Sequence, residues 1–433
     1  MAYQFYISKY FRRIIGQTSL HGAYHLSAPM HTLFERYMWG ILICSALLFS
    51  SFLMTLFWIR YLTNPTVISL DRNYHEWNTT FPSITICFHD RLNTTARDIM
   101  IQRIKPKNVT KFMRFLNLLA ETDISNIHQL KEFDEYSNLD LEAILNELIN
   151  KIHVNLELSN GMDANLHRIM SELGICYIFN SAILRYLSVS KNDRNDGTQE
   201  LVEISMIERE TTAVLNNLSS NGNIYYHGPF EVPTILKKLV IPSSTSAFLQ
   251  MSFKPVIIMA DSTIENLYVQ QRNCRYPHES NLHLFPEIYS HSLCSLECRL
   301  KQFVDKCGCV PYLYNFGGLP ICSLSKLSCI SENMLKVHQN GSSCGCLKDC
   351  TLINYTLQSF SLVEWFNNPL IKWDISVSKM RYSRRIIFHF SDVLVSAGGI
   401  AALFFGASFV TLAELIFLIV KTMIQDTQKK PKF

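Results

Sequence analysis

Charged residues are almost absent from two long stretches of this 433-residue sequence. The stretch 37–59 has no charged residue over 23 positions, and the stretch 393–420 has only Glu414. A helix of 23 residues is roughly 34 Å long, enough to cross a hydrocarbon core of about 30 Å. The two stretches argue against a wholly water-soluble protein. The sequence predicts two membrane-spanning helices, at 37–60 and 390–420.

Sequence motifs of enzymes are missing as well. The chain contains no HExxH, no GxSxG and no phosphate-binding loop. We therefore expect no enzymatic activity, no catalytic residue and no cofactor. The histidines are spread along the chain, and a structural role is the default interpretation for each, so we expect no metal site.

The excess of positive charge is confined to the two ends of the chain. Segments 1–36 and 421–433 each have four basic residues against one acidic residue, while the whole chain is only +4. The positive-inside rule places both ends in the cytoplasm, and nucleic-acid binding is not indicated. A cleaved signal peptide is the alternative for the first stretch. The long leader, the long apolar run and the lack of an A-x-A site argue against it.

Cysteine is missing from both tails. Twelve of the thirteen cysteines lie between Cys87 and Cys350, within the segment 61–389 that separates the predicted spans, and only Cys44 lies in a span. Because disulfides persist outside the cell, we predict an extracellular domain with six bridges. Six N-x-S/T glycosylation sequons also fall in this segment: Asn78, Asn93, Asn108, Asn217, Asn340 and Asn354.

Strand-like and helix-like patterns alternate after the first span. Residues 81–88 alternate with a period of two and predict a strand, and residues 174–180 predict another. Apolar spacing of i, i+3, i+4 predicts a helical insertion over 92–173. We expect Cys87 and Cys176 to pair, because Cys176 is the only other cysteine of this domain outside the dense cluster that follows. Further strands are predicted in the β-branched runs 236–242, 248–253 and 255–260.

Ten cysteines are concentrated between residues 274 and 350, with nearly symmetric spacing. Cys294 and Cys298 are four residues apart, which places them on one face of a helix about 6 Å apart. Cys344 and Cys346 are two residues apart, which places them on one face of a strand about 6.6 Å apart. Because these rises match, an antiparallel arrangement predicts the pairs Cys294–Cys346, Cys298–Cys344 and, outside them, Cys274–Cys350.

The other four cysteines of the cluster close its far end, and spacing alone leaves their pairing open. They are Cys307, Cys309, Cys322 and Cys329. A zinc site is the alternative for the two CGC sequences, but thiolates are rarely kept for metal outside the cell. We therefore favour disulfides for all of them.

Short motifs occur in a fixed order around these cysteines. They are His21-Gly22, Phe81-Pro82 through Cys87, the segment 174–180, Cys294-x-x-Glu297-Cys298, Cys307-Gly308-Cys309 with Pro311, the run from Cys344 to Cys350, Gly398-Gly399, Gly406-Ala407-Ser408 and Glu414. Each motif alone is uninformative. In this order, over residues 21–414, the chain resembles the degenerin/epithelial sodium channel family, and most of all its insect pickpocket branch.

This resemblance implies an α+β membrane protein whose two transmembrane helices flank a large disulfide-rich extracellular domain, in a trimeric channel. The extracellular domain would resemble a hand, with a palm, a β-ball, a finger over residues 88–175 and a thumb over residues 274–355. The family's bridges agree with the pairs above and imply Cys307–Cys329 and Cys309–Cys322. The implied partners are membrane lipid, related subunits in a homo- or heterotrimer, and an unknown extracellular ligand.

The second apolar stretch contains the residues that the resemblance assigns to ion conduction. A permeation path replaces the hydration shell of a cation with carbonyl or hydroxyl oxygens, so small residues are needed at the constriction. The resemblance makes Gly406, Ala407 and Ser408 the selectivity filter for permeant Na⁺. From composition alone, Gly398, Ala402 and Gly406 would instead form a packing face of small residues. The resemblance reverses that preference.

The same resemblance assigns further residues to the pore and its gate: His21, Gly22, Val395, Ser396, Gly398, Gly399 and Glu414. A carboxylate inside a span marks an ion pathway or, alternatively, an interfacial anchor. Asp392 is either an outer charge that attracts cations or the start of the helix. Val395, Ser396 and Ala402 depart from the usual family residues, and a bulky side chain at Val395 could favour the open state.

The sequence therefore predicts a subunit of an amiloride-sensitive, sodium-selective channel of the plasma membrane, gated by a ligand, by protons or by force. The main alternative is a two-span glycoprotein receptor or adhesion protein without a pore. Such a protein would need neither Glu414 nor a glycine-rich span. An ATP-gated trimeric channel would need clusters of Lys and Arg for the phosphates and a different cysteine series.

Overall fold

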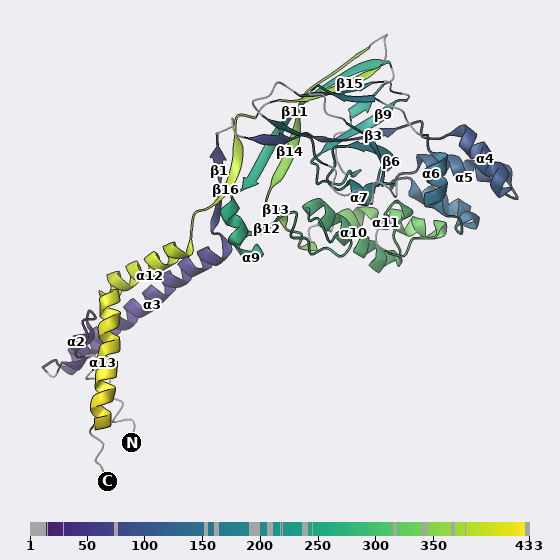
Figure 1. The fold of residues 1–433 in the computed structure, drawn as a ribbon. Coiled ribbons are helices and arrows are strands. Elements are labelled where there is room, and N and C mark those ends of the chain that lie inside the picture. The colour runs from purple at the N-terminus through teal and green to yellow at the C-terminus, as the bar shows by residue number, and fades with distance from the viewer. Residues whose placement is uncertain are drawn as a thin grey trace. The chain divides into compact units, whose positions relative to one another are not determined.

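Figure 1 shows the computed structural model of the chain. The structure describes residues 14, 16–28, 30–72, 77–150, 155–159, 164–189, 200–205, 211–216, 218, 220–235, 241–244, 246–314, 318–339, 344–364, 369–376 and 378–428. The chain divides into two compact units. The first consists of Met1–Val67, Asp261–Arg272 and Arg385–Phe433, and the second of Ile68–Ala260 and Asn273–Arg384.

Helices dominate the first unit, and the longest is α3 (Leu33–Thr63). The side chain of Thr32 accepts the N–H of Glu35, and the Glu35 carboxylate accepts the N–H of Thr32. This capping box starts α3 before the predicted boundary at residue 37. The helix is long and apolar enough to cross a membrane. It runs alongside α12 (Phe390–Phe405), as Figure 1 shows. The ring pairs Phe49–Phe404 and Tyr61–Phe390 join the two helices.

The predicted second span is not a single helix. α12 ends at Phe405 and α13 (Phe409–Gln428) begins after three residues, with a bend of 69° between the two segments. Together they qualify as one broken span or as a re-entrant loop. The prediction of an uninterrupted helix over 390–420 is therefore wrong at residues 406–408. The first unit also contains the short helices α2 (Ala23–Ser27), η3 (Ser262–Asn266) and α9 (Val269–Arg272).

Two large sheets contain most of the described strands. The larger has the order β1-β16-β11-β15-β8-β4, with β14 also paired to β11. Its strands are β1 (Thr66–Asp71), β4 (Asn155–Leu158), β8 (Thr212–Asn216), β11 (Ala247–Ala260), β14 (Leu352–Glu364), β15 (Leu370–Ile375) and β16 (Arg381–Ile386). The smaller has the order β10-β9-β3-β6-β5. Its strands are β3 (Ser83–Phe88), β5 (His167–Ser171), β6 (Gly174–Phe179), β9 (Gly222–His227) and β10 (Ile241–Ser243). A separate pair joins β2 (Asn78–Thr80) to β7 (Glu203–Ser205).

The predicted strands 248–253 and 255–260 are one strand, β11, which runs through Pro255. Its first half pairs with β15 over residues 248–253, and its end pairs with β16 over residues 258–260. Pro255 lies between these two stretches, so neither parallel strand is opposite a residue that lacks an N–H. Residues 236–240 of the predicted strand 236–242 lie outside the described residues.

The two sheets share a hydrophobic core around Trp373 of β15, which is fully buried. Its ring lies 6.5 Å from that of Phe81 and 6.1 Å from that of Phe179. Other residues of the smaller sheet, including Ile169 and Ile178, belong to a second core that contains the helices. All residues of β3 and β6 are therefore buried. The period-two pattern at 81–88 does not distinguish a solvent-exposed face of the sheet from a buried one.

The insertion between β3 and β6 is helical only in its first part. It contains α4 (Thr94–Ile104), α5 (Val109–Glu121), η2 (Ile127–Tyr136) and α6 (Leu141–Leu148). The prediction of a helical pattern up to residue 173 is wrong, because β4 and β5 follow. One core joins these helices to α7 (Leu184–Leu187), α10 (His291–Cys307) and α11 (Leu327–Gln339), so the predicted finger and thumb share their apolar interior.

Two predicted glycosylation sites also start helices. Asn93 and Asn108 are the N-caps of α4 and α5, and the Oδ1 of each accepts an N–H, from Ala96 and Lys111 respectively, both at 3.0 Å. The caps use Oδ1, whereas a glycan is attached at Nδ2. Asn78 and Asn354 are exposed on strands. Asn217 and Asn340 lie outside the described residues.

Six disulfides hold the second unit together, and they are the six expected pairs. They are Cys87–Cys176, Cys274–Cys350, Cys294–Cys346, Cys298–Cys344, Cys307–Cys329 and Cys309–Cys322. Helix α10 carries Cys294 and Cys298 as predicted. The predicted strand at 344–346 is wrong: the backbone there is irregular, with a φ of +63° at Gly345, and the strand β13 is only Lys348–Asp349.

Candidate functional site

The break between α12 and α13 follows from two local signals. Gly406, just after α12, has a φ of +59°, a left-handed conformation that favours glycine. The N–H groups of Gly406 and Ala407 turn back to carbonyls of α12. Ser408 then precedes α13: its Oγ accepts the N–H of Thr411 at 3.3 Å, and its N–H donates to Thr411 Oγ1 at 3.2 Å. Gly-Ala-Ser is thus a helix stop followed by a helix start.

His21 fills the space beside this break. The last carbonyls of a helix lack intrahelical partners, and His21 supplies two donors to the carbonyl of Phe405. Its backbone N–H lies at 3.0 Å and its Nδ1 at 3.2 Å. A Cβ added to Gly406 would lie 1.6 Å from His21 Nδ1. A glycine is therefore required at position 406 for two reasons. The backbone there is left-handed, and any side chain would occupy the space of the His21 ring.

Gly22 turns the chain from this contact into α2. Its φ is +79°, and an added Cβ would lie 3.3 Å from Ile43 Cδ1 and 3.5 Å from the ring of Trp39, both on α3. The segment that carries His21 is therefore docked on α3 at one end and on the α12 terminus at the other. The predicted residues His21, Gly22 and Gly406 are brought together at this place.

Glu414 on α13 has a partner from the same N-terminal segment. The hydroxyl of Ser19 donates to Glu414 Oε2. This hydrogen bond satisfies one oxygen of a carboxylate that the sequence places inside the second apolar stretch. Sequence reasoning missed Ser19, because an isolated serine gives no signal. It also missed Thr411, for which the spacing Ser408-x-x-Thr411 after a glycine was an available sign of a helix start.

The other predicted pore residues lie along α12, away from the break. Val395 is 74% exposed, and Gly398 and Gly399 are exposed as well. An added Cβ at either glycine would meet no atom within 4 Å in the part of the chain that the structure describes. Ser396 is half-buried. Asp392 Oδ2 accepts the N–H of His389 at 2.7 Å, which makes it part of the start of α12.

The break offers oxygen ligands in a segment that is otherwise apolar. Residues 406–408 lie outside regular helix, and they contribute the backbone carbonyls of Gly406 and Ala407 and the Ser408 hydroxyl. Such oxygens can replace the water around a cation. Non-helical backbone at membrane depth is tolerated only where protein buries it or where it lines a water-filled cavity. The arrangement is thus chemically suited to line an ion path.

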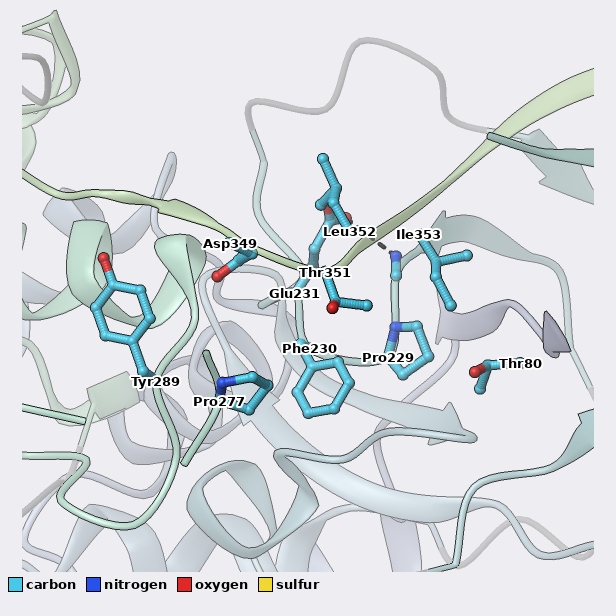
Figure 2. A pocket seen from close by; sticks show the side chains of 11 residues that line it. Thr80, Pro229, Phe230, Glu231, Pro277, Tyr289, Asp349, Thr351, Leu352 and Ile353 are labelled. Atoms are coloured by element: carbon cyan, nitrogen blue, oxygen red, sulfur yellow. Dashed lines mark hydrogen bonds between the residues drawn. The ribbon is translucent and has the colours of Figure 1, made fainter. Parts of the chain in front are cut away.

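A separate small cavity of about 50 Å³ lies in the second unit (Figure 2). Pro229, Phe230, Pro277, Tyr289 and Leu352 are among its lining residues. Two carboxylates also line it. Glu231 Oε2 accepts the N–H of Gly228 at 3.1 Å, the dashed line in Figure 2, and Asp349 Oδ1 accepts the N–H of His291 at 2.9 Å. The described residues include no group of three or more potential ligands that could hold a metal ion.

Asp349 makes the stability of the second unit depend on pH. Burial raises the pKa of Asp349 to about 6, and the nearby charge of Glu231 acts in the same direction, although His291 opposes both. An unfolded aspartate titrates near 3.9. The folded state therefore holds the proton more tightly than the unfolded state. Ionised Asp349 destabilises the fold above about pH 6, and the penalty fades as the pH falls from 6 toward 4.

We expect Asp349→Asn to raise the free energy of unfolding by about 2–3 kcal/mol at pH 7.5, since each pKa unit corresponds to about 1.4 kcal/mol. Asparagine keeps an oxygen for the N–H of His291 and removes the charge. Thermal unfolding of the detergent-solubilised chain between pH 4 and 7.5 measures the effect. The advantage over wild type should shrink toward pH 4. The exposed Asp90→Asn is the control, and an equal gain from both variants would contradict the assignment.

Comparisons with known proteins agree on one family. A family model described as amiloride-sensitive sodium channel matches residues 14–418. Pickpocket protein 11 of Drosophila melanogaster is 22% identical over 422 residues, which cover 92% of this chain and 73% of that protein. Acid-sensing ion channel 4-B of Danio rerio is 23% identical over 456 residues, with coverage of 96% and 77%. Sodium channel protein Nach of Drosophila melanogaster is 25% identical over 210 residues, and the match spans only 42% of this chain and 39% of that protein.

Proposed function

Because the chain belongs to the amiloride-sensitive sodium channel family, we propose that it is a subunit of a gated, amiloride-sensitive and sodium-selective channel. The channel lies in the plasma membrane, with both tails in the cytoplasm and the disulfide-bonded segment 61–389 outside the cell. Na⁺ is the permeant ion, and the channel needs no cofactor.

The break at Gly406-Ala407-Ser408, with His21 seated on it, carries this proposal. A helix that only anchors a protein in lipid satisfies its backbone groups by remaining helical. Here the apolar segment is interrupted, and the carbonyl of Phe405 takes its donors from His21, 384 residues away in sequence. This arrangement supports the filter role of residues 406–408 and the pore role of His21, Gly22 and Glu414. It disfavours the receptor or adhesion protein, in which the second span would be a plain anchor.

The exposed face of α12 supports assembly with further subunits. Gly398 and Gly399 meet no atom of the described residues, although small residues in a membrane helix usually serve close approach of another helix. In the proposed homo- or heterotrimer, these glycines face the neighbouring copies of α12 across the pore. Val395 and Ser396, on the same helix, line the gate.

The proposed stimulus acts on the extracellular domain, as a ligand, as protons or as force. The finger over residues 88–175 and the thumb over residues 274–355 are the parts that would receive it. Their shared core supports a coupled response, because neither can move without disturbing the packing of the other.

Voltage clamp of cells that express the chain, alone and with related subunits, tests this function. We expect an inward current that falls when Na⁺ is replaced by K⁺ and that amiloride blocks. Ser408→Ala, which removes the only side-chain oxygen of the break, should change the ratio of sodium to potassium permeability.

The matched control is Glu279→Gln, a charge change in the second unit whose carboxylate accepts the N–H of Tyr276. This variant should leave the ratio unchanged. A current that ignores both ion replacement and amiloride in every subunit combination would refute the channel function. An unchanged ratio in Ser408→Ala would instead assign the break to packing.

A further inference from the structure

A line of hydrogen-bonded side chains ties α2 to the start of α3. His25 Nδ1 lies 3.0 Å from His31 Nε2, and His31 Nδ1 lies 3.2 Å from Glu35 Oε2. We call this set, His25, His31 and Glu35, the imidazole relay. None of its residues touches the break itself, and all three are only half-buried. The relay belongs to the N-terminal segment that carries His21.

His31 is the central member of the relay, bonded to His25 on one side and to Glu35 on the other. An ionised carboxylate only accepts, so His31 Nδ1 must carry a proton and donate to Glu35. His31 Nε2 and His25 Nδ1 share one hydrogen bond, in which either nitrogen can be the donor. Replacing His31 by an apolar ring removes both bonds of the relay at once.

The relay ends on the first turn of α3. Glu35 Oε2 also accepts the backbone N–H of Thr32 at 2.8 Å, in the capping box of that helix. One turn further, the ring of Trp39 stacks on His25 with centroids 4.4 Å apart and an angle of 12° between the planes. α2 is thus attached to α3 at two successive turns, by a hydrogen-bonded line and by a ring stack.

The position of His21 depends on this attachment. His21 and Gly22 directly precede α2, a helix of five residues, so a shift of α2 on α3 moves them with it. Such a shift would lengthen the two hydrogen bonds from His21 to the carbonyl of Phe405, which now measure 3.0 and 3.2 Å. A functional site tolerates displacements of only about 0.5 Å before its geometry is lost.

We propose that His31 and Glu35, acting through His25, are positioning residues for ion selection. They hold α2 on α3 and thereby fix the position of His21 relative to Phe405 and Gly406. This inference rests on the proposed channel function and names residues that do not contact the ion path. It assigns the cytoplasmic end of α3 a role in selectivity that neither its apolar sequence nor its contacts with α12 would suggest.

The test compares reversal potentials under mixed Na⁺ and K⁺ for four variants, with surface amounts measured by biotinylation. His31→Phe keeps an aromatic ring, somewhat larger than imidazole, and leaves the Thr32–Glu35 capping box intact. It should lower the ratio of sodium to potassium permeability by about twofold or more, as expected when ligand oxygens are misplaced. Glu35→Leu should do the same. Glu35→Gln retains an oxygen acceptor and should stay close to wild type, and Met30→Leu, at a neighbouring exposed residue, is the matched control.

A merely structural role would reduce the amount of channel at the surface and leave the permeability ratio untouched. That result for His31→Phe, or a loss of selectivity in Glu35→Gln equal to that in Glu35→Leu, would overturn the inference. If Glu35→Leu fails to reach the surface, His31→Phe still decides. Absence of sodium current in the wild type, in every subunit combination, would instead refute the proposed function on which the inference rests.

Discussion

Gly406→Ala should reduce the sodium current by about tenfold or more while the protein still reaches the cell surface, because a site tolerates displacements of only about 0.5 Å. The added Cβ would lie 1.6 Å from His21 Nδ1 and 2.0 Å from Cε1, so the ring must leave its seat. The residue would also have to keep a φ of +59°, which costs an L-residue roughly 1–2 kcal/mol. Voltage clamp combined with surface biotinylation measures the two quantities separately.

Gly345→Ala separates backbone strain from displacement of His21. Gly345 has a φ of +63°, but an added Cβ there meets nothing within 4 Å among the described residues. It therefore carries a similar strain without a clash, and its current should remain near that of wild type. A current in Gly406→Ala that equals wild type in size and selectivity would show that the His21 seat is dispensable for conduction.

Arg299→Met should destabilise the extracellular domain by about 3–5 kcal/mol, the usual effect of leaving one member of a buried ion pair alone. Arg299 Nη1 lies 2.6 Å from Glu172 Oε1, and the two side chains are only 10% and 2% exposed. Arg299 is on α10, and Glu172 is in the turn between β5 and β6. The pair therefore joins the predicted thumb to the base of the predicted finger. Surface delivery should fall sharply, and solubilised protein should unfold at a lower temperature.

Two further variants test whether the unpaired charge is the cause. Glu172→Gln combined with Arg299→Met removes both charges and should recover a large part of the lost stability. Arg103→Met breaks an exposed pair with Glu147, at 2.8 Å, in which both side chains are more than half exposed. Such pairs contribute about 0–1 kcal/mol, so delivery should be normal. Equal losses in Arg103→Met and Arg299→Met would contradict the role of burial.

Much of the fold could be predicted from features with a fixed physical length. The spacing of the cysteines predicted three of the six pairs that are present, and Cys87–Cys176 followed because Cys176 was the only other cysteine outside the cluster. The pairs Cys307–Cys329 and Cys309–Cys322 were implied only by the family resemblance. The pairs of Cys344 and Cys346 were predicted from a strand that the structure does not contain. They are nevertheless correct, because two residues of irregular chain span a length similar to that of a strand. The start of α3 could not be taken from hydropathy, since its capping box is made of polar residues outside the apolar run.

The site was harder to predict because its parts come from opposite ends of the chain. The family resemblance pointed to His21 and Gly406 separately. No pattern in the sequence predicts that the His21 ring lies against Gly406. The break itself had local signals, a glycine and then Ser408-x-x-Thr411, which the surrounding apolar residues outweighed. Ser19 had no local sequence signal, because its role comes only from the hydrogen bond that it donates to the carboxylate of Glu414.

The helix starts at Asn93 and Asn108 affect how the two predicted glycosylation sites should be tested. Each asparagine uses Oδ1 as an N-cap, whereas the predicted glycan would be attached at Nδ2. The common Asn→Gln substitution would therefore remove the sugar and the cap together, and loss of a cap alone costs about 0.5–2 kcal/mol. Poor maturation of such a variant would then be ascribed to the missing carbohydrate when the helix is at fault. Thr95→Ala and Thr110→Ala abolish the acceptor sequence and leave both caps in place, so they isolate the contribution of the sugar.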